Sequence, residues 1–180
     1  MDRAELPLGP MSVALTALVV TAAVFDLRFR RVPNALTVSG FVVAIALRFV
    51  AGPGAGIDGI TGAVLAFVLC LPFFVLGVLG GGDAKLLIAV GAFMGPRDLL
   101  PALLLIASIG GIIGALDAAR RGVLLPVLYN CGDILKSWAT LGRRGKNRSL
   151  ASAGAVAIPY GLAIGLGALI WWFAKVGSLL

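Results

Sequence analysis

The sequence predicts an all-α membrane protein, a polytopic bundle of about six transmembrane helices. Of its 180 residues, 60% are hydrophobic and only 13% are charged, whereas soluble domains have roughly 45 to 50% apolar and 25% charged residues. The mean hydropathy is +1.06. The apolar residues form long runs of helix length, without the alternating segments of an outer-membrane barrel. We therefore expect a single membrane-embedded domain over residues 1–180.

The apolar runs predict the individual helices. The expected segments are Leu8–Phe25, Leu36–Val50, Ile60–Leu79, a short stretch from Asp83 to Arg97, Leu99–Leu116 and Ala153–Phe173. A charged motif follows the first run, so we interpret it as a retained helix and not as a signal peptide. Pro33 and the turn Gly52-Pro53-Gly54 should close two loops, and Pro72 should kink the third helix. The pair Trp171-Trp172 is expected at the membrane interface.

The fourth segment is too short for an ordinary membrane span. Asp83 and Arg97 are 14 residues apart, which is about 21 Å of helix against a hydrocarbon core of about 30 Å. Either the bilayer thins there, or Asp83 sits below the membrane surface in a dent that water can reach. Gly80, Gly81 and Gly82 precede Asp83, so we expect this carboxylate on an accessible loop before the helix. A role as helix N-cap is the alternative.

The basic residues predict the orientation of the bundle. Eleven of the fifteen lysines and arginines fall at one end of the expected helices and four at the other. Because positively charged loops stay inside, the first end should be cytoplasmic and both termini should lie outside. The eleven are Arg28, Arg30, Arg31, Lys85, Arg120, Arg121, Lys136, Arg143, Arg144, Lys146 and Arg148, and the four are Arg3, Arg48, Arg97 and Lys175.

Residues 117–152 are the one long polar connection, which this orientation makes cytoplasmic. Its middle part, Val123–Leu141, is loosely amphipathic and predicts a helix that lies on a surface. The basic residues between Leu141 and Leu150 indicate an anchor to lipid headgroups, and no nucleic-acid partner is expected.

The orientation brings two carboxylates, Asp26 and Asp83, to the same depth at the cytoplasmic end. Histidine is absent, and the two cysteines, Cys70 and Cys131, form no C-x-x-C motif. These absences exclude His-dependent proteases and His-ligated zinc hydrolases, and we expect no metal and no other cofactor. Two carboxylates brought close together cannot both ionise, so one can activate a water while the other donates a proton.

The motifs around these aspartates resemble a known family. D-L-R-F-R-R-V-P-N from Asp26, G-G-G-D-A-K from Gly80, and P-Y-G from Pro159 are similar to the motifs of type IV prepilin peptidases, which are aspartic proteases of the intramembrane G-x-G-D type. The resemblance covers nearly the whole chain. It implies that Asp26 and Asp83 are catalytic. It also implies supporting roles for Pro33, Asn34, Gly80, Gly82 and Lys85.

The resemblance further implies a substrate and a location. The substrate would be a prepilin or pseudopilin with a basic leader and an apolar helix, cut at the cytoplasmic face of a bacterial inner membrane. Larger members carry a cytoplasmic insertion with two C-x-x-C pairs and also methylate the new N-terminus. Nothing like that insertion fits here, so we expect the short form that serves tight-adherence (Flp) pili, with peptidase activity only.

Several alternatives stay open from the sequence. Asp26 could only neutralise Arg30 one turn away, and Lys85 could bind a substrate acid or anchor its helix at the headgroups. Asp117 is expected in a surface ion pair with Arg120 or Arg121, and the P-Y-G turn either packs against the active site or only kinks a helix. Two other functions remain: a proton or cation transporter that uses both aspartates as a relay, and a non-enzymatic subunit of a pilus or secretion system.

Overall fold

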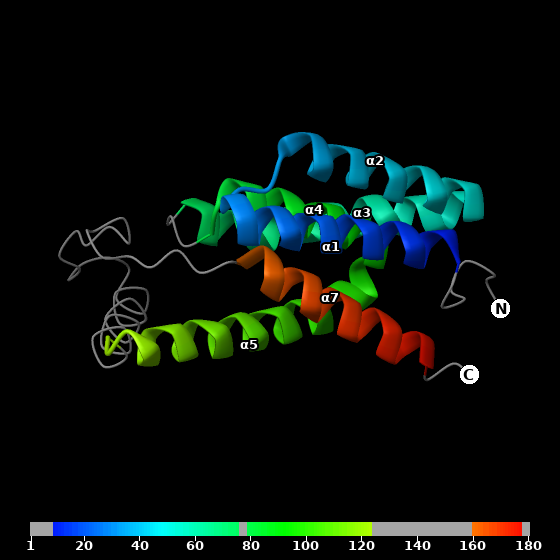
Figure 1. Ribbon diagram of the computed structural model, residues 1–180. Helices are drawn as coiled ribbons and strands as arrows, with labels where there is room; N and C mark the ends of the chain where they lie inside the picture. The colour runs from blue at the N-terminus through cyan, green and yellow to red at the C-terminus, as the bar shows by residue number, and fades with distance from the viewer. Residues whose placement is uncertain (1–8, 76–78, 124–159, 178–180) are drawn as a thin grey trace, which may run out of the picture. The chain divides into compact units, whose positions relative to one another are not determined.

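The computed structural model describes residues 9–75, 79–123 and 160–177, and within these ranges every regular element is a helix. The predicted all-α fold is thereby confirmed (Figure 1). The helices are α1 (Pro10–Phe29), α2 (Asn34–Ala51), α3 (Pro53–Val75), α4 (Gly81–Met94), α5 (Pro96–Arg120) and α7 (Tyr160–Gly177). Of these, α1, α2, α3 and α5 are long and apolar enough to cross a membrane. The apolar part of α7 is shorter, and α4 has only 14 residues.

The described residues belong to two compact units. The first unit contains α1 to α4, the part of α5 up to Gly110, and α7. The second unit contains the remainder of α5 and the turn after it, up to Val123. The predicted surface helix, apart from Val123, and the basic run between Leu141 and Leu150 lie outside the described residues. The single domain over residues 1–180 stays a prediction.

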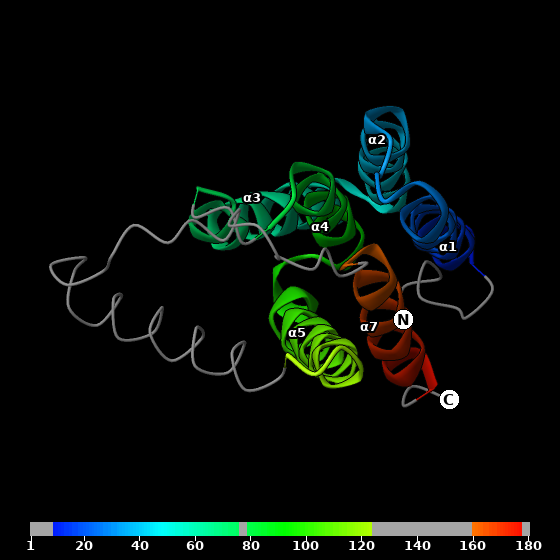
Figure 2. The same ribbon diagram turned by 60° about the vertical axis from the view of Figure 1, so that its left-hand side comes forward.

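Helix α4 lies at the centre of the first unit. It contacts α1, α2, α3 and α7, and the two views of the ribbon show it between these helices (Figures 1 and 2). Its side chains supply much of the core, because Leu86, Val90 and Phe93 are completely buried. Leu15 and Val19 of α1 are also completely buried. The shortest helix is therefore the one that the others surround.

Helix α1 continues one turn beyond the predicted end at Phe25 and stops at Phe29. No residue before Pro33 interrupts the helical pattern, so the turn that starts at Asp26 stays helical. Arg30 closes the helix in a left-handed conformation with φ 51°, and its N–H donates to the Asp26 carbonyl at 2.8 Å. Asp26 consequently lies within the helix and not in the loop that follows it.

Helix α3 begins at Pro53, earlier than the predicted start at Ile60. Gly52 alone makes the turn between α2 and α3, with φ 148°. Pro53 can begin the helix because proline lacks only an N–H that would have no intrahelical partner there. Pro72 lies inside α3, and the kink expected there stays a prediction.

The C-terminal helix also departs from the prediction. Helix α7 ends at Gly177 and not at Phe173, and the segment before Tyr160 lies outside the described residues. Trp172 is buried, and its indole N–H donates to the Ser12 hydroxyl of α1 at 2.9 Å. This tryptophan therefore joins α7 to α1, and the interfacial position of the Trp171-Trp172 pair stays a prediction.

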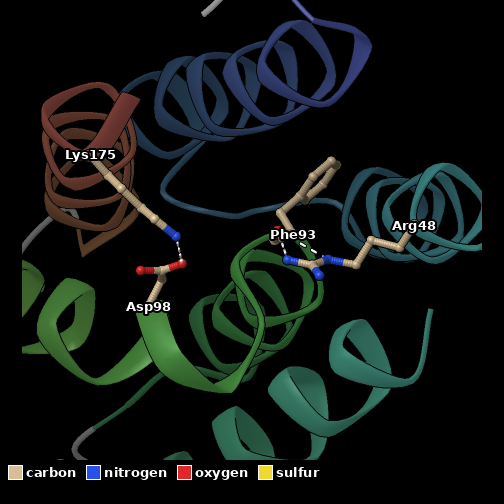
Figure 3. A network of polar contacts seen from close by, with 4 residues as sticks. All are labelled: Arg48, Phe93, Asp98 and Lys175. Atoms are coloured by element: carbon tan, nitrogen blue, oxygen red, sulfur yellow. Dashed lines mark hydrogen bonds and ion pairs between the residues drawn. The ribbon is translucent and has the colours of Figure 1, made fainter. Parts of the chain in front are cut away.

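Two basic residues in the last turns of α2 and α7, Arg48 and Lys175, form polar contacts with neighbouring helices (Figure 3). The Arg48 guanidinium donates through Nη2 to the Phe93 carbonyl at 2.6 Å and through Nη1 to the Ala55 carbonyl at 3.3 Å. Lys175 of α7 forms an ion pair with Asp98 of α5. Phe93 lies in the last turn of α4, where a backbone carbonyl has no hydrogen-bond partner within its own helix. Arg48 supplies that partner.

Helices α3 and α4 approach each other backbone to backbone. A Cβ atom on Gly62 would lie 2.3 Å from the Gly91 carbonyl oxygen and 2.7 Å from the Gly95 Cα. Side chains would not fit, and helices in membranes associate largely through such close packing of small residues.

We predict that Gly62→Ala destabilises the protein by about 1 to 3 kcal/mol, because a methyl group must separate two backbones that cannot give way. Thermal unfolding of the purified protein in detergent measures the loss. Gly54→Ala in the same helix is the control, since a Cβ atom there meets nothing within 4 Å. Equal stability of the two variants would contradict the close packing of α3 on α4.

Candidate active site

The structure brings the two predicted catalytic aspartates to the same end of the first unit. Asp26 lies in the last turn of α1, and Asp83 lies in the first turn of α4. The loop after α1 rests on the turn that carries Asp83, because a Cβ atom on Gly82 would lie 3.4 Å from both Val32 Cβ and the Val32 carbonyl oxygen. We call this end, with Asp26, Val32, Gly82, Asp83 and the Gly161 described next, the motif end.

Asp26 is a buried carboxylate with a backbone donor. Its side chain and backbone are together only 7% exposed. The N–H of Gly161, in the first turn of α7, donates to Asp26 Oδ2 at 2.7 Å. Within the described residues Asp26 forms no ion pair, and Arg30 is exposed and approaches it only through the backbone. The alternative that Asp26 merely neutralises Arg30 is therefore wrong.

Asp83 lies within helix α4 and not on a loop before it. Gly80 is the N-cap, and Gly81 begins the helix. Asp83 is thus neither the expected loop residue nor the N-cap. A Cβ atom on Gly80 would lie 2.9 Å from Asp83 Oδ2, so the carboxylate folds back over Gly80.

The environment of Asp83 disfavours its charge. Asp83 lies outside the four helices that are long enough to cross a membrane. Burial, and then the nearby Asp26 carboxylate, raise the pKa of Asp83 from 3.8 to about 6. The second cause requires that the two carboxyl groups lie close enough to interact, because a neighbouring negative charge favours the protonated form. These surroundings therefore favour the protonated form of Asp83.

The other predicted supporting residues join α4 to the start of α2. Pro33 caps α2, and its carbonyl accepts the N–H of Leu36 at 3.1 Å. Lys85 donates from Nζ to the Asn34 side-chain oxygen at 2.9 Å. Lys85 is therefore used, at least in part, to hold the loop after α1 against α4. This contact was not among the roles expected for Lys85.

A pocket opens along the same loop. It has a volume of about 430 Å³ and is lined by Phe25, Phe29, Arg31, Val32, Pro33 and Asn34. The two phenylalanines are one turn apart on α1, and their ring centroids are 5.6 Å apart. The sequence prediction did not include this pocket; the only signal for it was the i,i+4 spacing that puts two aromatic residues beside Asp26 on one face of the helix.

Two further expectations have clear outcomes. Asp117 forms the predicted ion pair, with Arg121 Nε at 2.9 Å, in the second unit.

Gly161 of the P-Y-G motif contacts Asp26, so the first alternative for this motif, packing against the aspartate site, is the one observed. Pro159 lies outside the described residues. The sequence did not indicate that a backbone N–H of this motif would be the contacting group.

Comparison with known proteins agrees with this arrangement. The family model described as the type IV leader peptidase family matches residues 13–116, a range that includes both aspartates. The chain belongs to the type IV leader peptidase family. No solved structure matches the chain.

Two curated relatives of this leader peptidase family member are named prepilin leader peptidase/N-methyltransferase. The protein of Myxococcus xanthus (strain DK1622) is 32% identical over 129 residues, which cover 68% of this chain and 38% of that protein. The protein of Bacillus subtilis (strain 168) is 27% identical over 106 residues, which cover 58% of this chain and 43% of that protein. The matched region therefore spans less than half the length of either relative.

We predict that Asp83→Asn stabilises the folded protein at alkaline pH. Because the folded-state pKa is raised, the stability linked to Asp83 is fully present below 3.8 and is lost as the pH rises through about 6. The amide carries no charge at any of these values. We expect a gain of about 1 kcal/mol at pH 8, well below the full value of the shift because Asp83 is only partly buried and solvent screens it.

The measurement is thermal unfolding in detergent at pH 8 and at pH 3.5, with the exposed Asp58→Asn as the control. The gain should be present at pH 8, absent at pH 3.5, and absent in the control at both values. A loss of stability in Asp83→Asn at pH 8 would mean that Asp83 is not under electrostatic strain.

Proposed function

We propose that this chain is an aspartic endopeptidase that removes the leader peptide from type IV prepilin-like precursors. The observation that carries the proposal is the pair of carboxylates at the motif end. Asp26 is buried with one backbone donor, and the charge of Asp26 contributes to the raised pKa of Asp83. Two carboxyl groups in such different surroundings supply one base and one acid, as hydrolysis at neutral pH requires. Family membership supports the same activity.

The chemistry needs only these two groups and a water. The ionised carboxylate takes a proton from the water as its oxygen bonds to the peptide carbonyl carbon, and the protonated carboxyl group donates a hydrogen bond to the carbonyl oxygen. When the C–N bond breaks, the second carboxyl group passes its proton to the leaving nitrogen. One product then carries a new carboxyl group and the other a new amine. A proton returns from the first aspartate to the second, which restores the starting state.

The substrate class follows from the same site. A leader peptide precedes an apolar helix in these precursors, so the scissile bond must reach a site at the end of the helical bundle. Asp26 and Asp83 occupy such an end. In our proposal the precursor is of the Flp pilin or pseudopilin class, this chain performs no N-methylation, and its surroundings are the bilayer of a bacterial inner membrane.

We predict that Asp26→Asn and Asp83→Asn each reduce the cleavage rate by about 10² to 10⁴-fold, because an amide can act neither as base nor as acid. The double variant should be little worse than either single variant, since the two groups act as a unit. Each variant is co-expressed with a prepilin that carries a basic leader. Loss of the leader is followed by the size shift on a gel, at equal membrane levels of the peptidase.

Asp117→Asn is the matched control. Its carboxylate is paired with Arg121 in the second unit, so cleavage should stay within twofold of wild type. Near wild-type cleavage by either Asp26→Asn or Asp83→Asn would refute the two-aspartate mechanism. Loss of cleavage in Asp117→Asn at normal expression would identify a different carboxylate.

The proposed orientation is tested separately. We propose a cytoplasmic motif end because eleven of the fifteen lysines and arginines fall on that side. In a variant with both native cysteines replaced, Lys146→Cys should react with a membrane-impermeant thiol reagent only after the membrane is opened. Arg97→Cys should react in intact cells. Labelling of position 146 in intact cells would reverse the topology and put the site on the wrong side for a leader peptide.

A further inference from the structure

The inference concerns Gly161, the second residue of α7. Its N–H is among the first four of the helix, which have no partner within α7. This N–H donates to Asp26 Oδ2 at 2.7 Å, and the contact is buried. The residues are 135 positions apart in the chain. One end of α7 is thus attached directly to a proposed catalytic carboxylate.

Only glycine permits this approach. A Cβ atom at position 161 would lie 2.9 Å from both Asp26 Cβ and Asp26 Oδ2, and 3.1 Å from Asp26 Cγ. Carbon atoms do not pack at such distances, so any larger residue must displace Asp26 or α7. Gly165 is one turn further along the same helix and also faces α1, but a Cβ atom there would lie 3.3 Å from the Val19 carbonyl and at least 3.7 Å from side chains.

The contact distinguishes the two aspartates chemically. A backbone N–H can only donate, so it favours the ionised carboxylate as its acceptor, and the positive end of the α7 dipole acts in the same direction. The surroundings of Asp83 differ, because Asp83 lies in the first turn of α4, where Gly80 at the N-cap position provides no side-chain cap hydrogen bond. The two carboxyl groups therefore have unequal surroundings.

We propose that Gly161 is a positioning residue: its N–H holds Asp26 as the ionised carboxylate that accepts the proton of the attacking water, and Asp83 carries the proton that the leaving amine receives. The raised pKa of Asp83 points in the same direction. This assignment rests on the proposed peptidase function. It adds which aspartate is the base and which part of the chain fixes it.

The kinetic test is Gly161→Ala, with Gly165→Ala as the control on the same helix. Displacing a catalytic group by about 1 Å typically costs about 10²-fold in rate. We therefore expect kcat of Gly161→Ala to fall by about 10²-fold while KM stays within about twofold, and we expect Gly165→Ala to keep both values within a few-fold. A loss that appeared only in KM, or an equal loss in both variants, would overturn the positioning role.

A spectroscopic test does not depend on that variant folding. Tyr160-Gly161 is the only Tyr-Gly pair in the chain, because the other tyrosine, Tyr129, precedes Asn130. Protein labelled with carbonyl-¹³C tyrosine and ¹⁵N glycine therefore reports the Gly161 amide as a single signal. We expect its proton resonance to lie downfield at neutral pH and to move upfield in Asp26→Asn, which removes the charge of the acceptor. An unchanged resonance in Asp26→Asn would overturn the inference.

The outcomes separate this inference from the proposed function. If Asp26→Asn is inactive and Gly161→Ala retains wild-type kcat, the positioning role fails and the peptidase proposal stands. If Asp26→Asn cleaves the precursor normally, the peptidase mechanism fails, and the role assigned to Gly161 fails with it.

Discussion

The arrangement of the first unit depends on how a short, central helix is held by side-chain contacts at both ends. Helix α4 has 14 residues, or about 21 Å of rise, and is surrounded by four other helices. At its C-terminal end the Arg48 guanidinium binds the Phe93 carbonyl, which water would otherwise have to satisfy. At its N-terminal end Lys85 binds Asn34. These contacts fix α4 along its own axis, and they thereby fix the position of Asp83.

Glycine serves two separate purposes in this arrangement. Along α3 and α4 it permits close approach of backbones, as at Gly62 against Gly91, where lipid supplies little driving force and tight packing must hold helices together. Around the carboxylates it leaves room for polar contacts, as at Gly161 against Asp26 and Gly80 against Asp83. The first kind of glycine concerns stability, and the second concerns the chemistry of the site. A count of glycines in the sequence does not distinguish the two.

The sequence was sufficient for the fold class and for bringing Asp26 and Asp83 to one end, because both follow from counting apolar runs of helix length. It was insufficient for the contacts between helices. The partner of Asp26 is a backbone N–H 135 residues away. Every residue except proline has a backbone N–H, so the order of side chains in the sequence cannot identify such a donor. Trp172 illustrates the same limit, since a tryptophan near a helix end fits a membrane interface as well as a buried contact with Ser12. Helix starts at Pro53 and Gly81 differed from the predictions because proline and glycine also occupy first helical turns.

The surroundings of the aspartates support the proposal that these residues serve chemistry and not stability. A structural role for Asp83 would favour a neutral residue, because burial and the charge of Asp26 both disfavour its ionised form. Asn would fill nearly the same space without that penalty. A purely structural role is equally unfavourable for Asp26. A buried carboxylate costs free energy unless it is well hydrogen-bonded, and the described structure gives Asp26 one donor at 2.7 Å. Asp26 thus has a backbone donor while burial and a neighbouring charge disfavour ionised Asp83, and such unequal surroundings are what the proposed hydrolysis by two carboxyl groups requires.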